Sequence, residues 1–347
     1  MDEGGEVPSV GPAGILAAIG NTPLVELAKI MPGCGFQIYA KLERFNPGGS
    51  IKDRTALSML RGKIDSGELG PGSVVVESSS GNLAVGLAQV CGYFGIRFIC
   101  VVDSRTTARN IEILRAYGTE VELVTEGDPV TGELLPARLQ RVRDIVAGLP
   151  GAYWPNQYAN VLNPRAHLQT MSEIVSALPG PVDYLFCATS TFGTLRGCAD
   201  YIRVHKLSMT LVAVDAMGSV IFAEPGEKMP AVRRLLPGHG ASVRSALADP
   251  SAPDVVVHVT DQECVVACRR LVATEAILAG GSSGATVAAL AHLRSANLIA
   301  PGSRCVLIFP DGGDRYLETI FSDEWVASNF GDISHLWKQS TFSRGGL

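Results

Sequence analysis

Apolar residues along this chain gather in short continuous runs rather than in alternating patterns. From residue 73 one unit repeats, in which an apolar run is followed by a turn of small residues and then by a segment with helical periodicity. The first such strands are Val74–Val76, Phe98–Val102 and Val121–Val124. Continuous apolar runs of this length are typical of parallel strands that are buried on both faces.

A second series of the same kind begins at Val182. Its strands and helices are predicted at Tyr184–Cys187, Arg196–His205, Leu211–Val214, Val255–Val257, Gln262–Glu275 and Cys305–Phe309. Two such series predict an α/β fold with two open, mainly parallel sheets and flanking helices. Ligands of open α/β sheets bind beyond the carboxyl ends of the strands, so we expect the binding site in a cleft between the two sheets.

The two series suggest a division of the chain into domains. We expect residues 51–162 to form a smaller, mobile α/β domain and residues 163–330 a larger one, with residues 1–50 packing partly on the larger domain. Residues 331–347 are predicted to be a tail, because the pattern fades after Phe330. The segment Glu126–Leu149 is polar and predicted to be partly helical, and the segment Pro225–Pro253 is rich in Pro, Gly and Ala and predicted to be irregular. Both are interpreted as mobile coverings of the cleft.

Composition narrows the class of partner. With 347 residues, 46% of them hydrophobic, and 38 glycines, the chain suits a compact enzyme rather than a disordered protein. The net charge of −5 comes without a long basic run, which argues against nucleic acid or a membrane surface as a partner and favours a small metabolite.

Three further features indicate a cytoplasmic protein. The first dozen residues are acidic, which argues against a secretory signal, and no apolar run is long enough to cross a bilayer. The eight cysteines form no CxxC pair and lie mostly within apolar stretches, as expected of buried thiols in a reducing compartment. Cys264 and Cys268 fall one helical turn apart, but no histidine lies near them in sequence, so no metal site is expected.

One lysine stands out as a candidate for covalent chemistry. Lys52 follows the turn Asn46-Pro47-Gly48-Gly49 and stands at a predicted helix start. Partial burial would lower its pKa and free the nucleophilic amine. The alternative is a solvated lysine in a surface turn.

Four small-residue turns accompany this lysine. Ser78–Asn82 follows a buried strand and offers hydroxyls and N–H groups to an anion such as a substrate carboxylate; the alternative is a serine-rich helix cap. Ser190–Thr194 has the same position in the second series and suits a phosphate, but it lacks a Walker lysine and a GxGxxG pattern, so a nucleotide is disfavoured. Gly280–Gly284 and Pro310–Arg315 are the others. Together with the lysine, they are the parts of a site for pyridoxal 5′-phosphate (PLP).

These pieces resemble the fold-type II PLP enzymes of the cysteine synthase and cystathionine β-synthase family. The resemblance runs from about Ile19 to Trp325. It is carried by Asn21–Leu24, the motif around Lys52, Ser79–Asn82, Asn156–Tyr158, Thr191–Gly197, Gly238–Ala241, Gly281–Gly284 and Gly313–Tyr316. Family members are commonly homodimers, so the resemblance also implies a homodimer.

The resemblance assigns roles to individual residues. Lys52 matches the Schiff-base lysine, Asn82 the partner of the cofactor's ring hydroxyl, and Ser282 the partner of its pyridine nitrogen. A serine does not enforce a protonated ring, which favours β-elimination over transamination. The residues matched to the phosphate loop are Ser190, Thr191, Phe192, Gly193 and Thr194. Those matched to substrate binding are Ser79, Ser80, Gly81, Leu83, Gln157, Tyr158, Ser190 and Gly238.

Departures from the cysteine synthase pattern point to one branch of the family. Cysteine synthases usually carry Phe in place of Tyr158, Gly in place of Ser190, and Thr in place of Ser79 and Leu83. The strings Glu77–Leu83, Tyr153–Asn160 and Val214–Phe222 resemble instead a branch that makes 2,3-diaminopropionate precursors for siderophores and peptide antibiotics. That resemblance implies a PLP-dependent transferase that joins O-phospho-L-serine to L-glutamate by β-replacement, with Lys52 as general base.

Two anions need binding groups that a cysteine synthase does not require: the leaving phosphate and the second amino acid. Arg138 is the candidate for one of them, because a guanidinium binds oxyanions bidentately; the alternative is a solvated helix arginine. Tyr158 and Ser190 are expected to form hydrogen bonds with glutamate; the alternative is that they only pack in a slightly altered pocket.

Three other functions are considered. They are a cysteine synthase that uses sulfide, a catalytically silent scaffold, and a threonine or serine dehydratase, which the strings around Tyr158 do not favour.

Overall fold

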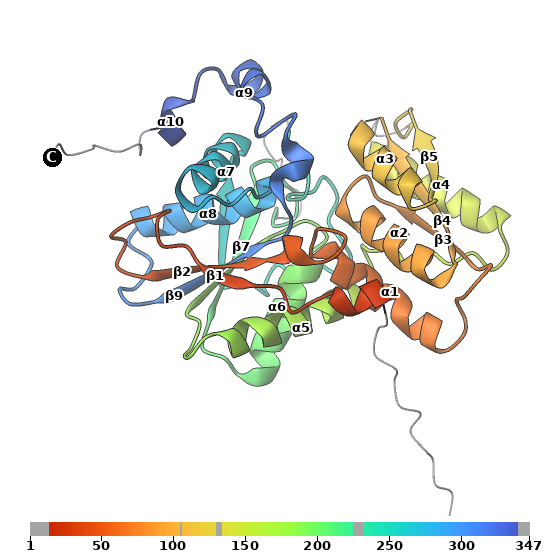
Figure 1. The fold of residues 1–347 in the computed structure, drawn as a ribbon, viewed down its shortest axis with the longest axis horizontal. Coiled ribbons are helices and arrows are strands. Elements are labelled where there is room, and N and C mark those ends of the chain that lie inside the picture. Colours follow the sequence, from red (N-terminus) through yellow and green to blue (C-terminus); the bar gives the residue numbers. More distant parts are fainter. Residues whose placement is uncertain (1–13, 105, 130–133, 225–231, 233, 339–347) are drawn as a thin grey trace, which may run out of the picture.

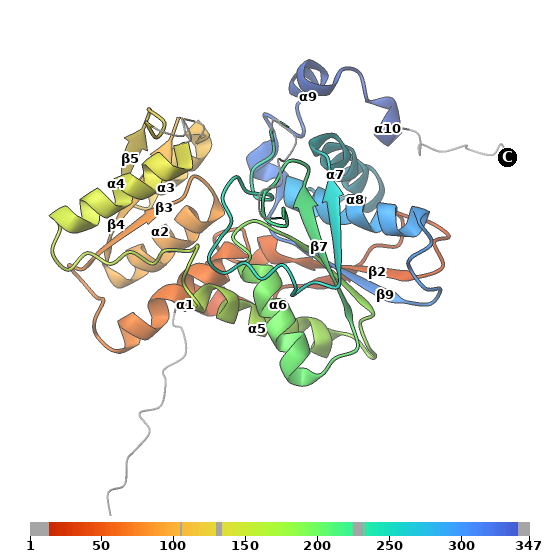
Figure 2. The ribbon, with the colours of Figure 1, turned by 180° about the vertical axis from the view of Figure 1, so that it is seen from behind.

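The computed structural model describes residues 14–104, 106–129, 134–224, 232 and 234–338. Within them the chain forms two separate sheets, each flanked by helices, which lie side by side in Figure 1 and, from behind, in Figure 2. The fold prediction of two mainly parallel sheets with flanking helices is confirmed.

The smaller sheet contains β3 (Val74–Ser78), β4 (Arg97–Asp103) and β5 (Glu120–Val124), all parallel. Its helices are α2 (Asn82–Phe94), α3 (Ala108–Ala116) and α4 (Leu134–Gly148). Successive strand residues pack on opposite faces. Val75, Cys100 and Val102 join the core with α2, whereas Val76, Ile99 and Val101 pack with Val142 of α4. The apolar runs lack alternation because both faces are covered.

The larger sheet has the strand order β1-β2-β9-β6-β7-β8, in which only β1 is antiparallel to its neighbour. Its strands are β1 (Leu24–Glu26), β2 (Gln37–Leu42), β6 (Tyr184–Ala188), β7 (Thr210–Ala216), β8 (Val255–Val259) and β9 (Arg304–Phe309). Helices α5 (Leu162–Ala177) and α6 (Gly193–His205) cover one face, and α7 (Asp261–Glu275) and α8 (Gly281–Ser295) cover the other. β1 and β2 were not predicted.

Helix α1 (Lys52–Asp65) connects the two sheets and packs on both α2 and α5. It begins at Lys52, the helix start that the sequence predicted. Three short 3₁₀ turns complete the elements around it: Gly14–Ala18, Glu43–Phe45 and Gly313–Tyr316.

The structure describes parts of three further segments that the sequence singled out. The predicted covering Glu126–Leu149 mostly forms α4, which packs on the smaller sheet because its apolar face meets the outer side of β3 and β4. Residues 130–133, 225–231 and 233 of the two coverings lie outside the described residues. The predicted tail contains α10 (His335–Lys338), which follows α9 (Asp323–Phe330) and packs against α7; residues 339–347 also lie outside the described residues.

Candidate active site

Four turns meet at the carboxyl ends of the strands, as expected for open parallel sheets. Isolated backbone bridges join Ser50 to Asp311 and Ala279 to Gly312. The Lys52 turn, the start of α8 and the end of β9 are therefore held together, although they are far apart in sequence. Asn82, at the start of α2, reaches the same place from the smaller sheet, because its side chain donates to Asp311.

Lys52 is fixed by the turn before it. Gly49 has a left-handed φ of 83°, the Gly48 N–H donates to the Asp53 carboxylate at 2.5 Å, and the Ile51 N–H donates to the carbonyl of Pro310 at 2.8 Å. A Cβ on Gly48 would lie 2.5 Å from Asp53 Oδ1, so the close approach requires glycine. Burial lowers the pKa of Lys52 to about 8, which makes the free amine accessible near neutral pH.

The amide of Asn82 is oriented from both sides. Its Nδ2 donates to Asp311 Oδ2 at 2.8 Å, and its Oδ1 accepts a hydrogen bond from Arg315. Arg315 also donates to the carbonyl of Gly48 at 2.6 Å, and Tyr316 donates its hydroxyl to Asp311 Oδ2 at 2.6 Å. Burial raises the pKa of Asp311. Sequence reasoning singled out the Pro310–Arg315 turn but gave Asp311 and Arg315 no role.

The predicted phosphate loop forms the N-terminus of α6. Phe192 caps the helix with a left-handed φ of 71°, a conformation that is uncommon for a residue with a bulky side chain. The N–H groups of the first helical turn have no partners within the helix, and the helix dipole adds partial positive charge, so the loop suits a phosphate. Thr191 Oγ1 accepts a hydrogen bond from Asn163 at 3.4 Å.

A buried histidine that sequence reasoning missed lies under this loop. The Nε2 of His167 is 3.3 Å from Thr194 Oγ1 and 3.4 Å from Thr55 Oγ1, and its Nδ1 is 3.5 Å from Thr170 Oγ1. Burial, together with the charges of Lys52 and Arg54, lowers the pKa of His167 well below its usual value. The imidazole is therefore neutral and ties α1 to the phosphate loop.

Ser282 is the second residue of α8 and is 4% exposed. Gly238 approaches it with a left-handed φ of 96°, and a Cβ on Gly238 would lie 4.0 Å from Ser282 Oγ. Within the described residues, no protein group hydrogen-bonds the Ser282 hydroxyl. It is therefore available to a ligand between Gly238 and α8.

The predicted substrate turn is held from three sides. Cys100 and Asn110 donate to the carbonyls of Ser79 and Ser80 at 3.2 Å and 3.0 Å. The Gln157 side chain donates to the carbonyl of Ser78 at 3.2 Å. Gly81 caps α2, and the side chain of Leu83 is buried in the core beside α2. The hydroxyls of Ser79 and Ser80 thus belong to a rigid turn.

Arg138 lies inside the smaller unit rather than on its surface. It is 9% exposed, and its Nε is 3.1 Å from Asp103 Oδ2, so the alternative of a solvated helix arginine is wrong. Burial raises the pKa of Tyr158, and the nearby positive charge of Arg138 opposes that shift. Arg138 and Tyr158 therefore lie within electrostatic reach of one another. The carbonyl of Tyr158 accepts a hydrogen bond from Ser245 at 2.7 Å.

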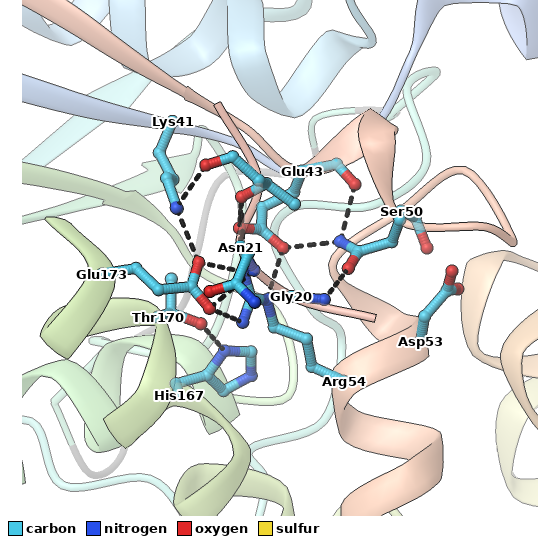
Figure 3. A network of polar contacts seen from close by, with 12 residues as sticks. Gly20, Asn21, Lys41, Glu43, Ser50, Asp53, Arg54, His167, Thr170 and Glu173 are labelled. Atoms are coloured by element: carbon cyan, nitrogen blue, oxygen red, sulfur yellow. Dashed lines mark hydrogen bonds and ion pairs between the residues drawn. The ribbon is translucent and has the colours of Figure 1, made fainter. Parts of the chain in front are cut away.

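A buried ionic network lies beside the first turn of α1 (Figure 3). Arg54, two residues after Lys52, pairs with Glu43 and with Glu173 at 2.7 Å each, and Lys41 pairs with Glu173 at 2.6 Å. The Thr22 hydroxyl donates a hydrogen bond to Glu43 at 2.7 Å, so the Asn21–Leu24 motif is held to this network. The network ties α1 to β2 and α5 and so fixes the helix that begins at Lys52.

The arrangement fits PLP. A buried lysine amine, an oriented asparagine amide, an unbonded serine hydroxyl and a helix N-terminus are the donors and acceptors that its aldehyde, ring and phosphate require. The family model for the pyridoxal-phosphate dependent enzymes matches residues 15–311. The chain belongs to this family; the predictions of an enzyme and of PLP as its cofactor are confirmed.

Two curated relatives are similar along almost their whole length. The N-(2-amino-2-carboxyethyl)-L-glutamate synthase of Cupriavidus metallidurans is 44% identical over 315 residues, which cover 90% of this chain and 91% of the relative. The enzyme of the same name from Ralstonia nicotianae is also 44% identical over 315 residues, covering 90% of each chain. The predicted branch of the family is therefore confirmed.

Solved structures show the same fold. O-ureido-L-serine synthase is 33% identical, with a TM-score of 0.79 over 90% of this chain and 98% of that one. A hydrogen sulfide-producing enzyme from Fusobacterium nucleatum is 31% identical, with a TM-score of 0.79 over 88% of this chain and 100% of that one. In the part of the chain that the structure describes, no helix is both long and apolar enough to cross a membrane.

Proposed function

We propose that this chain joins O-phospho-L-serine and L-glutamate by PLP-dependent β-replacement, giving N-(2-amino-2-carboxyethyl)-L-glutamate and phosphate. The observation that carries the proposal is the 44% identity, over about nine tenths of each chain, to two synthases of that name. Arg138 supports it, because this buried cation is close enough to influence the pKa of Tyr158, and a second amino acid with two carboxylates needs a cation that sulfide does not.

The cofactor, when bound, supplies an electron sink that makes the Cα proton of O-phosphoserine acidic and allows phosphate to leave. Lys52 would hold the cofactor covalently until the substrate amine replaces it, and the released Lys52 amine, unprotonated near neutral pH because of its lowered pKa, would then take up that proton. Asn82 bonds the ring hydroxyl and Ser282 the ring nitrogen. The N–H groups and hydroxyls of residues 190–194 bind the cofactor phosphate.

The first amino acid is held through its carboxylate by the rigid turn of Ser79, Ser80 and Gly81 and by Gln157. Leu83 supplies an apolar wall, and Gly238 leaves room beside Ser282. The second amino acid binds Arg138, Tyr158 and Ser190. Its α-amine then attacks Cβ, and Lys52 returns the proton to Cα.

Several broader features belong to the same proposal. Residues 51–162 form the smaller domain, residues 163–330 the larger one, residues 1–50 pack partly on the latter, and residues 331–347 are the tail. The enzyme works in the cytoplasm as a homodimer. Its product leads toward L-2,3-diaminopropionate for a siderophore or a peptide antibiotic.

A competition between nucleophiles tests the proposal. The PLP-loaded protein is incubated with O-phosphoserine and with either L-glutamate or sulfide, and both phosphate release and product mass are measured. The proposal predicts a glutamate adduct formed with equimolar phosphate. O-acetylserine in place of O-phosphoserine identifies the leaving group, and a Lys52→Ala variant shows that the reaction belongs to this site. Rapid cysteine formation without a glutamate adduct would establish a cysteine synthase instead.

A further inference from the structure

A buried carboxylate joins two of the three sequence strings that distinguish this branch, because it belongs to Glu77–Leu83 and is bonded by Tyr153–Asn160. Glu77, near the end of β3, is 0% exposed. Its Oε1 accepts hydrogen bonds from the Ser78 N–H at 2.8 Å and from Trp154 Nε1 at 3.0 Å. Its Oε2 accepts from the Gln157 N–H at 3.2 Å, and the Asn156 N–H also bonds this carboxylate. All its bonding partners are N–H donors.

Apart from the Ser78 N–H, these donors belong to one loop, residues 153–158, here called the substrate loop. Tyr153 starts the loop by pairing with β3, donating to the carbonyl of Val74 at 2.8 Å. Asn156 then turns the chain with a left-handed φ of 51°, which points successive N–H groups toward the Glu77 carboxylate. The middle of the loop is therefore wrapped around a single carboxylate.

The same loop contacts the rest of the candidate site. The Gln157 carbonyl accepts a hydrogen bond at 2.9 Å from Asn163, which also bonds Thr191 of the phosphate loop. The next residue, Tyr158, accepts one from Ser245. A shift of the loop would displace Gln157 and Tyr158 together, whereas among the described residues no hydrogen bond or ion pair joins Glu77 to Lys52, Asn82 or Ser282.

We propose that Glu77 is the positioning residue of the substrate loop, setting the places of Gln157 and Tyr158 and thereby the affinity for both amino-acid substrates. This inference rests on the proposed function, because it takes these two side chains to be substrate ligands. Glu77 acts through the loop and touches neither substrate nor cofactor. Its carboxylate is effective only when ionised, because a protonated oxygen would present an O–H to N–H donors.

The Glu77→Gln variant keeps the shape of the side chain but replaces one acceptor oxygen by an NH₂ that opposes the loop's N–H groups. Loss of a hydrogen bond to a charged group predicts that the KM values for both amino acids rise about tenfold. The dissociation constant of PLP should stay within about twofold of wild type, and kcat should change less than KM.

A second variant and a control accompany this one. Trp154→Phe removes one donor to Glu77 and should raise the KM values for both amino acids by a smaller factor. The matched control is Glu120→Gln, on exposed Glu120 of β5, which should behave as wild type.

Tryptophan fluorescence provides a readout that does not depend on turnover. Burial raises the pKa of Glu77 to about 7. The other titratable groups near it are Cys100, whose pKa burial raises to about 12, and Tyr153 and Tyr158, whose pKa values burial also raises. We expect Trp154 emission to titrate near pH 7 in the wild type and in Glu120→Gln.

The two sets of measurements separate the possible failures. Disappearance of this titration in both Glu77→Gln and Trp154→Phe, with raised KM values, supports the inference. Unchanged KM values in Glu77→Gln, or a loss of PLP affinity equal to the change in KM, would overturn it. If the wild type forms no glutamate adduct, the proposed function fails, and the fluorescence titration still tests the contact between Glu77 and the loop.

Discussion

Asn82 Nδ2 donates to Asp311 Oδ2 at 2.8 Å, so the residue that starts α2 on the smaller sheet is oriented by a carboxylate that follows β9 of the larger sheet. The contact joins the two units at the point where the cofactor ring is proposed to lie. Arg315 fixes the opposite side of the same amide. The orientation of Asn82 therefore depends on two residues of the turn at the end of β9.

Replacing Asp311 by Asn should weaken PLP binding. One charged oxygen of Asp311 accepts hydrogen bonds from both Asn82 and Tyr316, and the neutral amide of Asn cannot replace that charge. A hydrogen bond to a charged group contributes about 1.5–3 kcal/mol to stability. We expect the dissociation constant of PLP, measured by titrating the apoprotein, to rise at least about tenfold. Asp314→Asn, on the same turn but half-exposed, is the control. Equal affinities of the two variants would contradict this account of Asn82.

The lowered pKa of Lys52 predicts how cofactor incorporation depends on pH. Only the unprotonated amine reacts with an aldehyde, and burial lowers the pKa of Lys52 from 10.5 to about 8. The rate at which apoprotein takes up PLP covalently should therefore rise with pH through about 8 and then level off. A rate that still climbs above about pH 9.5 would indicate an ordinary solvated lysine.

The role proposed for Arg138 can be separated from its structural role. Arg138→Lys keeps a positive charge beside Asp103 but loses the planar, bidentate donor pair, so the KM for L-glutamate should rise about tenfold. Phosphate release from O-phosphoserine alone should be unchanged. The control is Arg141→Lys on the same helix, whose exposed side chain pairs with Glu122. An unchanged KM for glutamate would remove Arg138 from the substrate site.

The ionic network of Arg54, Glu43, Glu173 and Lys41 should contribute strongly to stability. Glu43→Gln leaves part of the buried Arg54 charge uncompensated, and breaking a buried pair typically costs about 3–5 kcal/mol. We expect a loss of that size in the free energy of unfolding, measured by urea denaturation. Asp65→Asn, which breaks an exposed pair with Arg61 on the same helix, should have little effect. Similar midpoints for the two variants would show that the network is dispensable.

The sequence predicted most of the fold because its central strands are buried on both faces. Continuous apolar runs form the greater part of β3, β4, β6, β7 and β9. β1 and β2 were missed, because β1 is only three residues long and β2 mixes exposed and buried positions. The start of α6 lay three residues before its predicted position, since glycine and threonine carry little helical signal.

The candidate site was predictable only where residues adjacent in sequence form a motif. Lys52, Asn82 and the Ser190–Thr194 turn stand out because glycines and hydroxyl residues follow strands. Asp311, His167 and Glu77 carry no such local signal, because their partners are distant in sequence and are set by packing. The ion pair between Arg138 and Asp103 on β4 also joins residues that are distant in sequence, so no local motif predicts it.

The central claim is that this site makes a carbon–nitrogen bond between two amino acids. The most direct test is mass spectrometry of the product formed by the PLP-loaded protein from O-phosphoserine, with L-glutamate and sulfide supplied together at equal concentration. The account predicts N-(2-amino-2-carboxyethyl)-L-glutamate as the main product, with one phosphate released per molecule. Cysteine as the main product, with no glutamate adduct, would contradict it.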